Sequence, residues 1–301
     1  MCCCFARSNK RRILLYVKAT LTYIGKTLRA GAKLFVPLSA RESIRDAIAL
    51  WQRHSIDRQL ARFRRAVWNL PVDATAQCLD YHVSITDGPD FYVQYKDEFI
   101  RRVYHFEAKR PDPLIIDGGS NIGMSILSFK KAYPKARIIG FEPDPQIYNR
   151  LKANLKSNNI DGVTLVQAGI GGRAGTALFT QDHMAGGRIS SDGIIVDIEP
   201  LSRYLSEPVD FLKLNVEGQE LPALEEASAA GKLANVREMV VEYHGFADAP
   251  QLLGKILNLL DREGFRYLIH DFDDQTNSHS KPPFRLTTQT TWFCLIYAKR
   301  L

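Results

Sequence analysis

The chain has 301 residues, of which 45% are hydrophobic and 24% charged, a composition typical of a globular enzyme of one or two domains and not of a disordered protein. Its five cysteines are too few for a disulfide scaffold, which favours a reducing, cytoplasmic compartment. The sequence has no Cys/His cluster with zinc-ligand spacing and no run near the ~18 apolar residues of a membrane-spanning helix.

The formal charge of +7 is unevenly spread along the chain. Residues 1–70 hold 15 Lys and Arg against 3 Asp and Glu, a balance of +12, and the other 231 residues hold 25 against 30, a balance of −5. A basic appendage on a mildly acidic body argues for an N-terminal docking element and against a nucleic-acid groove in the main domain. We therefore expect no nucleic-acid partner.

Residues 10–36 place apolar side chains three or four positions apart among basic ones, which predicts a basic amphipathic helix. Such a helix could pack on its own protein, pair with a second copy in a homodimer, or lie on a membrane surface as a peripheral contact. A signal peptide is less favoured because Lys18 interrupts the apolar stretch. The cysteines at 2–4, beside basic residues, would suit palmitoylation in a eukaryotic cell and would be incidental in a bacterium.

A second helix is predicted at about 40–69. Ser39 and Glu42 have the spacing of a capping box, and apolar residues continue at helical spacing until Pro71 stops the pattern. We therefore expect residues 1–75 to form a basic helical N-terminal extension.

A change of pattern after this extension opens a new domain. Residues 81–86 and 91–95 predict two strands around an Asp-Gly-Pro turn at 87–89. We assign residues 80–301 to this second domain.

From residue 114 short apolar runs alternate with helical patterns. Strands are predicted at 114–117, 137–142, 163–168, 211–216, 237–243, 265–271 and 291–297, and helices at about 122–132, 145–157, 220–230 and 250–263. This alternation predicts an α/β fold with a mostly parallel sheet covered by helices on both faces. Only a polar loop separates the last two strands, so they should pair antiparallel.

A glycine-rich turn, DGGSNIG at 117–123, joins the first of these strands to a helix. Glycines let the backbone approach a ligand closely, and the carboxyl edge of an open parallel sheet is where ligands bind. By itself the turn could be a tight connection or part of a dinucleotide site.

An acidic residue ends the following strand. Glu142, 25 residues after Asp117, can accept hydrogen bonds from both hydroxyls of a ribose, although a solvated carboxylate is the simpler interpretation. An acidic loop without a basic phosphate clamp suits a positively charged nucleoside, and S-adenosylmethionine is such a ligand.

Six segments of the chain resemble the FkbM-type family of S-adenosylmethionine-dependent methyltransferases. They are YHF at 104–106, IDGGSNIG at 116–123, YPKA at 133–136, FEPDP at 141–145, VDFLKLNVEGQE at 209–220 and VEYH at 241–244. The segments follow the family order and spacing over about 90–272, and the first 70 residues take no part.

The resemblance implies a class I methyltransferase fold, a Rossmann-like seven-stranded sheet with the last strand antiparallel. It implies cofactor contacts at the following residues: Asp117, Gly118, Gly119, Asn121 and Glu142, with the backbone near Gln167 and Ala168 flanking the adenine. It also implies methylation of a hydroxyl oxygen on a sugar, glycan, polyketide or other small metabolite. At Asn215 the family commonly has Asp, so a carboxylate role there is not carried over.

A hydroxyl acceptor must also lose a proton. His244, at the carboxyl end of its predicted strand, is the candidate general base because a neutral imidazole near pH 7 can take the proton; the alternative is a packed structural histidine. Glu217 and Lys213 lie where acceptor-side residues sit in such folds, with structural roles as the alternative. His183 could reach the acceptor if the loop 181–191 acts as a lid.

The sequence thus predicts transfer of a methyl group from S-adenosylmethionine to a hydroxyl oxygen of a small-molecule, sugar, glycan or lipid-linked acceptor. One alternative is a noncatalytic scaffold on the same fold, which Asn215 favours and which Asp117 and Glu142 disfavour. The other is a nicotinamide-dependent oxidoreductase, which would need a phosphate-binding glycine pattern that residues 117–123 lack.

Overall fold

The computed structural model describes residues 38–180, 188–189, 193–247, 249–270, 287 and 291–300. The chain divides into two compact units, Met1–Arg65 and Ala66–Leu301. The helix predicted at 10–36, the candidate lid residue His183 and most of the loop before the last strand lie outside the described residues.

The first unit is described through one helix. Helix α2 (Leu38–Val67) runs for 30 residues and confirms the helix predicted at 40–69. It stops four residues before Pro71, because proline cannot continue a helix. Within this helix, most side chains from residue 53 to its end are exposed. Among the described residues, no helix combines the length and apolar character needed to cross a membrane.

The second unit begins with a small hairpin and a short helix. Strands β1 (Thr75–Cys78) and β2 (Tyr81–Ser84) pair antiparallel. Helix α3 (Gly88–Tyr95) follows and continues into the π-helix η1 (Lys96–Arg101).

The prediction of a strand at 91–95 is wrong, because these residues belong to helix α3. The Asp87 side chain accepts a hydrogen bond from the Asp90 backbone N–H at 2.8 Å and caps the helix. Proline in the first helical turn lacks an N–H that would otherwise need a partner. Phe91 and Tyr95, four residues apart, are both buried on one face of α3. The Asp-Gly-Pro sequence thus starts a helix instead of closing a hairpin.

All seven strands predicted from residue 114 onward are confirmed. They are β3 (Leu114–Gly118), β4 (Arg137–Phe141), β5 (Val163–Val166), β10 (Phe211–Leu214), β11 (Glu238–Phe246), β12 (Arg266–His270) and β13 (Thr291–Lys299). They form one sheet in the order β12-β13-β11-β10-β3-β4-β5. Strand β13 pairs antiparallel with both neighbours, as expected for the last two strands, and the other pairs are parallel.

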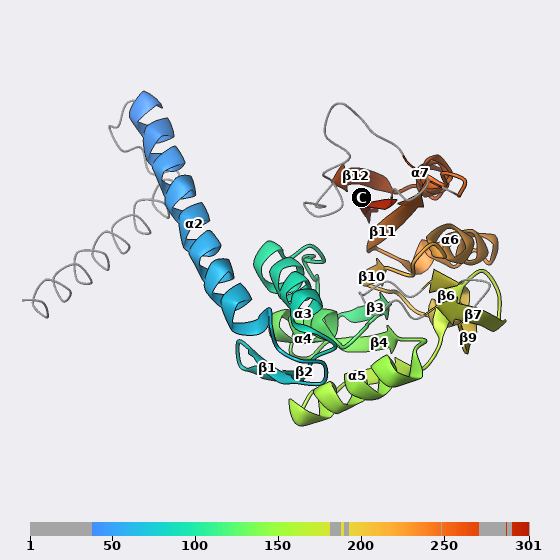
Figure 1. Cartoon of the computed structure of the whole chain (residues 1–301). Helices are drawn as coiled ribbons and strands as arrows, with labels where there is room; N and C mark the ends of the chain where they lie inside the picture. The colour runs from blue at the N-terminus through green and yellow to red at the C-terminus, as the bar shows by residue number, and fades with distance from the viewer. Residues whose placement is uncertain are drawn as a thin grey trace, which may run out of the picture. The chain divides into compact units, whose positions relative to one another are not determined.

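The four predicted helices are also confirmed. They are α4 (Met124–Ala132), α5 (Pro145–Ser157), α6 (Glu220–Ala229) and α7 (Leu253–Arg262), with short 3-10 helices η2 (Leu201–Tyr204) and η3 (Leu233–Asn235). Helices α6 and α7 cover one face of the sheet, and α3 and α4 lie on the other (Figure 1). One buried cluster joins Leu212 and Leu214 of β10 to Leu224 of α6 and Leu260 of α7. Because side chains alternate along a strand, Phe211 and Lys213 of β10 point to the opposite face, where α4 lies.

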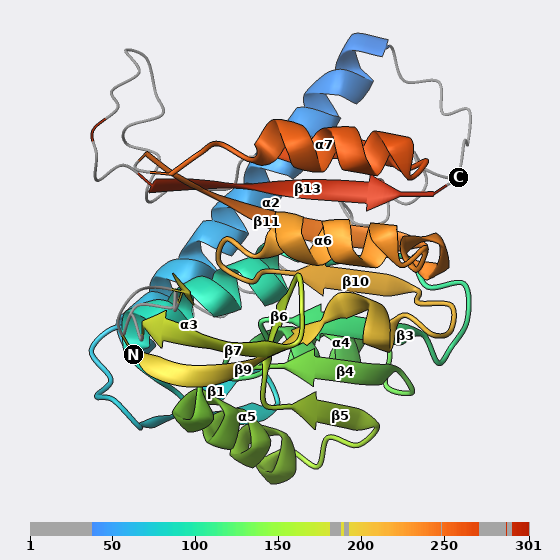
Figure 2. The ribbon, with the colours of Figure 1, turned by 90° about the vertical axis from the view of Figure 1, so that its right-hand side faces the viewer.

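A second, smaller sheet was not predicted. Its strands are β6 (Gly169–Gly171), β7 (Gly175–Thr180), β8 (Arg188–Ile189) and β9 (Ile194–Pro200), in the order β6-β9-β7-β8. It lies on the same side of the main sheet as α6 (Figure 2). The alternation of apolar and polar residues in β9 was the available signal, but β9 has only one buried residue and most of β7 is exposed. Because β6 follows Ala168 directly, the small sheet starts at the carboxyl end of β5.

Candidate active site

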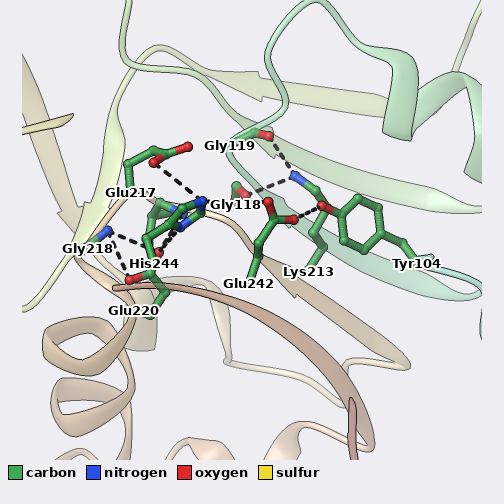
Figure 3. Close-up of polar contacts among 10 residues, drawn as sticks. Tyr104, Gly118, Gly119, Lys213, Glu217, Gly218, Glu220, Glu242 and His244 are labelled. Carbon is green, nitrogen blue, oxygen red and sulfur yellow. Dashed lines mark hydrogen bonds and ion pairs between the residues drawn. The ribbon is translucent and has the colours of Figure 1, made fainter. Parts of the chain in front are cut away.

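The carboxyl ends of the parallel strands meet along one edge of the main sheet, where ligands bind in open α/β folds. The predicted site residues fall into two groups there. Those at or just after the ends of β3, β4 and β5 form the cofactor side, and those on or after β10 and on β11 form the acceptor side. Figure 3 shows Glu217 and His244 on the acceptor side, and Lys213 reaching toward the glycine turn.

The glycine turn after β3 has a shape that the chain itself requires. Gly119 has φ +79° and Asn121 φ +48°, values in the left-handed region that favour Gly and Asn. A Cβ atom on Gly119 would lie 2.0 Å from the backbone oxygen of Asn215. Glycine is therefore needed here for close approach of the loop after β10, in addition to any approach of a ligand. Contacts within the chain thus fix the conformation of the turn without a ligand.

A buried ion pair between Asp117 and Lys213 stabilises this turn. Asp117 is 0% exposed; its Oδ1 lies 2.9 Å from Lys213 Nζ, and its Oδ2 accepts a 2.6 Å bond from Ser125 Oγ. Lys213 Nζ also donates to the carbonyl oxygens of Gly119, at 2.7 Å, and Gly118, at 3.3 Å. Burial lowers the pKa of Lys213, but the nearby carboxylates outweigh it and raise that pKa. The ammonium group is charged and engaged on three sides, which favours a positioning role over a direct catalytic one.

Glu142 follows β4 and faces the same turn. Its Oε2 accepts from the Asn121 N–H at 3.0 Å and its Oε1 from the Asp144 N–H at 2.9 Å. Burial outweighs these two bonds and raises the pKa of Glu142 to about 7. Gln167, which is exposed, and Ala168, which is buried, follow the adjacent strand β5. The structure thus brings the predicted cofactor residues together at neighbouring strand ends.

On the acceptor side one histidine faces three carboxylates. His244 Nε2 lies 3.5 Å from Glu217 Oε2 and 3.6 Å from Glu242 Oε1, and its Nδ1 lies 3.5 Å from Glu220 Oε1. Glu217 lies on the turn that follows β10, and Glu220 is the first residue of α6; Figure 3 shows both carboxylates beside the imidazole. We call these four residues the acid–imidazole cluster.

The charges of this cluster reverse the expected protonation of His244. Burial lowers the pKa of His244, but Glu217, Glu220 and Glu242 outweigh it and raise the pKa to about 10. The imidazole is therefore protonated at pH 7, whereas a general base has to be neutral. Burial also raises the pKa of Glu217 to about 7, although the charge of His244 lowers it. With these pKa values, the Glu217 carboxylate can accept a proton near pH 7, whereas the protonated His244 cannot.

The turn that presents Glu217 is held by the first residue of α6. Both carboxylate oxygens of Glu220 accept from the Gly218 N–H, at 3.1 and 3.0 Å, and Oε1 also accepts from the Val216 N–H at 3.3 Å. Glu217 and Gly218 have φ values of +52° and +96°. Glu220 is buried and structural, while Glu217, at the apex, keeps 20% of its side chain exposed.

Tyr104 and Glu242 join the two sides, and no role was predicted for either. The Tyr104 hydroxyl donates to Glu242 Oε2, and its ring centroid lies 5.1 Å from Lys213 Nζ, a cation–π distance. Glu242 precedes His244 by two residues on β11, so both side chains point to one face. This spacing was the sequence signal for Glu242. Tyr104 comes from a segment before β3, and its signal was the YHF segment at 104–106 that resembles the family.

The strand order, the antiparallel β13 and the glycine turn at the carboxyl edge define a class I methyltransferase fold. Residues 117–267 match the family described as the Methyltransferase FkbM domain. The chain belongs to this family.

Known proteins similar to this chain cover parts of it. Methyltransferase sdnD of Sordaria araneosa is 30% identical over 203 residues, which are 53% of this chain and 76% of that protein. The 2-O-methyltransferase NoeI of Sinorhizobium fredii is 36% identical over 71 residues, 24% of this chain and 28% of that protein. The crystal structure of methyltransferase FkbM from Methylobacillus flagellatus matches with a TM-score of 0.43 and 17% identity, over 66% of this chain and 46% of that one.

Proposed function

We propose that the protein transfers a methyl group from S-adenosylmethionine to a hydroxyl oxygen of a small-molecule, sugar, glycan or lipid-linked acceptor. The observation that carries the proposal is the pairing, along one sheet edge, of a shaped glycine turn facing Glu142 with a proton-accepting group, Glu217. The similarity to NoeI, a 2-O-methyltransferase by name, supports oxygen as the acceptor atom.

The residues present fit S-adenosylmethionine. Each Glu142 oxygen accepts a single backbone N–H, which leaves lone pairs free for ribose hydroxyls. The Oδ1 atom of Asn215, beside Gly119, is buried and has no hydrogen-bond partner among the described residues, so it can accept from an ammonium group. The Lys213 ammonium is engaged on the turn's own carbonyl oxygens instead of facing a pyrophosphate. We assign the adenine contact to the backbone at Gln167 and Ala168.

When bound, S-adenosylmethionine supplies an electrophilic methyl group, so the chain has to orient the acceptor and remove its proton. Glu217 takes this proton at a carboxylate oxygen. His244 stays protonated and holds the Glu217 carboxylate through Nε2 at 3.5 Å. Glu242, held by the Tyr104 hydroxyl, shares that imidazole and orients it.

Calorimetric titration of S-adenosylmethionine tests the cofactor assignment. At pH 8.5, above its pKa of about 7, Glu142 is ionised. Glu142→Ala then removes a charged hydrogen-bond partner worth roughly 1.5–3 kcal/mol, so affinity should fall about 10- to 100-fold. Glu207→Ala is the matched control, because it removes an exposed carboxylate paired with Arg137 far from the turn. A folded Glu142→Ala variant that binds as tightly as the parent would show that the ribose assignment is wrong.

The same titration with NAD tests the oxidoreductase alternative, for which we expect no binding. Mass spectrometry of extracts incubated with the protein and methyl-labelled cofactor then identifies the acceptor and the methylated atom. Cofactor binding without a labelled product in any extract would favour the scaffold alternative.

We assign the reaction to residues 80–301, in the cytoplasm. To the basic extension 1–75 we assign docking on a membrane surface or on a second copy, because that segment carries the whole basic excess of the chain.

A further inference from the structure

A cavity of about 250 Å³ lies beside Glu217 and His244, between the start of α6, the end of β11 and the start of α7. One wall is polar and consists of residues of the acid–imidazole cluster together with Gly218 and Gln219. The rest of the lining, which we call the apolar wall, consists of Leu221, Phe246, Ala249, Pro250, Leu252 and Ile256. Tyr243 also lines the cavity, and its hydroxyl accepts a hydrogen bond from the Leu252 N–H at 3.1 Å.

The apolar wall selects against a fully hydroxylated group. Burying a hydroxyl without a hydrogen-bond partner costs about 1–3 kcal/mol, whereas burying a methylene group gains about 0.8 kcal/mol. Side chains such as Leu252 and Ile256 offer no hydrogen-bonding atom. The volume is below the roughly 300–1,000 Å³ of whole small-molecule sites, so the cavity holds part of a ligand.

The polar wall selects on charge. Glu217 and Glu220 both line the cavity, and His244 is the cation between them. Glu242 approaches the same imidazole from β11, so one positive charge is shared among three carboxylates. An anionic group in the cavity would meet this excess of negative charge, so the cavity accepts neutral or cationic groups.

We propose that this cavity holds an uncharged apolar part of the acceptor, a ring or a short alkyl chain, while the hydroxyl group to be methylated projects toward Glu217. The inference rests on the proposed function and narrows its acceptors to alcohols that carry an apolar moiety. It adds a specificity role for the β11–α7 loop and the start of α7, neither of which contributed a predicted site residue.

Ala249 provides a way to block the cavity without disturbing the core. It lines the cavity but is itself exposed, on the loop between β11 and α7. Ala249→Trp therefore places a large side chain at the cavity wall. Gln251→Trp is the matched control, since residue 251 is also exposed, lies two positions further on and does not line the cavity.

Saturation-transfer NMR with benzyl alcohol and cyclohexanol as apolar probes, and myo-inositol as a polar probe of similar size, measures the selectivity directly. The two apolar alcohols should bind the full-length parent protein more tightly than inositol does. Ala249→Trp should weaken their binding roughly fivefold or more, because the ring loses its apolar contacts, and Gln251→Trp should leave it unchanged. Ala249→Leu, a smaller block, should give an intermediate loss and serves if the Trp variant does not fold.

Equal binding of inositol and cyclohexanol, or unchanged binding to a folded Ala249→Trp or Ala249→Leu variant, would overturn the proposal. Calorimetry with S-adenosylmethionine separates this failure from failure of the proposed function. Ala249→Trp should bind the cofactor like the parent, because residue 249 lies on the β11–α7 loop and outside the glycine turn. A parent protein that binds the apolar alcohols but not the cofactor would defeat the proposed function and leave the cavity's selectivity intact.

Discussion

The cofactor side and the acceptor side of the candidate site are built in different ways. On the cofactor side, Asp117 contacts Ser125 Oγ at 2.6 Å and Lys213 Nζ at 2.9 Å, and Glu142 accepts two backbone N–H groups at 2.9 and 3.0 Å. On the acceptor side, His244 lies 3.5–3.6 Å from each of three carboxylates. The first arrangement is fixed in advance by short contacts within the chain. The second is held by charge balance and can change its protonation during a reaction.

Breaking the pre-shaped side should have the largest effect. Lys213→Met leaves Asp117 buried without its cation, so the free energy of unfolding should fall by about 3–5 kcal/mol. Lys131→Met, which removes an exposed ion pair with Asp80, should change it by less than about 1 kcal/mol. Urea denaturation measures both values. Equal losses for the two variants would show that the buried pair does not fasten the turn.

Removing the proposed proton acceptor should have the next largest effect. With an acceptor identified, Glu217→Gln should lower turnover about 10²-fold or more and leave cofactor affinity nearly unchanged, as loss of a general base does. From the sequence alone, His244 was the candidate general base. The pH profile decides between the two residues.

Turnover that depends on ionised Glu217 should rise as the pH passes through about 7, whereas a His244 base should make it rise near pH 10. Because the charge of His244 lowers the pKa of Glu217, His244→Gln should move the rise to higher pH. If the turnover of the parent protein rises only near pH 10, His244 and not Glu217 is the general base.

The charge balance of the acceptor side should also appear in the stability of the protein. The pKa of His244 is raised in the folded state, from an ordinary 6.5 to about 10. Its protonation therefore stabilises the fold fully below pH 6.5, and this contribution is lost as the pH rises toward 10. The difference in melting temperature between the parent and His244→Gln should shrink over that range. His82→Gln, at an exposed strand position, is the control, and a constant difference would show that the cluster does not hold the proton.

The N-terminal extension should have the smallest effect on either side of the site. A truncated chain starting at Ser39 should keep the cofactor affinity of the full chain, because all the predicted cofactor residues lie beyond residue 116.

The extension itself can be tested by co-sedimentation of both chains with anionic and neutral vesicles. Each Lys or Arg near an anionic surface contributes about 1 kcal/mol, so the full chain should bind anionic vesicles and release them in added salt. Absence of vesicle binding, together with a change from dimer to monomer on truncation, would favour self-association instead.

The sequence by itself determined the main sheet, its four helices and the places of the predicted cofactor residues at strand ends. Apolar runs bounded by turn residues specify strands in local terms, and Asp117 and Glu142 stand directly at strand ends. A locally ambiguous segment was misjudged. The Asp-Gly-Pro sequence at 87–89 suits both a hairpin turn and a helix start, and the burial of Phe91 and Tyr95 decides for the helix.

The charge state of the site was decided only by the tertiary structure. In the sequence, the only carboxylate near His244 on its own strand is Glu242, two residues before it. The fold adds Glu217 and Glu220 from a turn more than twenty residues earlier, and the pKa of the imidazole rises because the charged form gains partners that only folding supplies. The cavity beside them has the same origin, since its walls come from α6, β11 and α7. A linear pattern locates residues, but charge and shape depend on which of them the fold brings within a few ångströms.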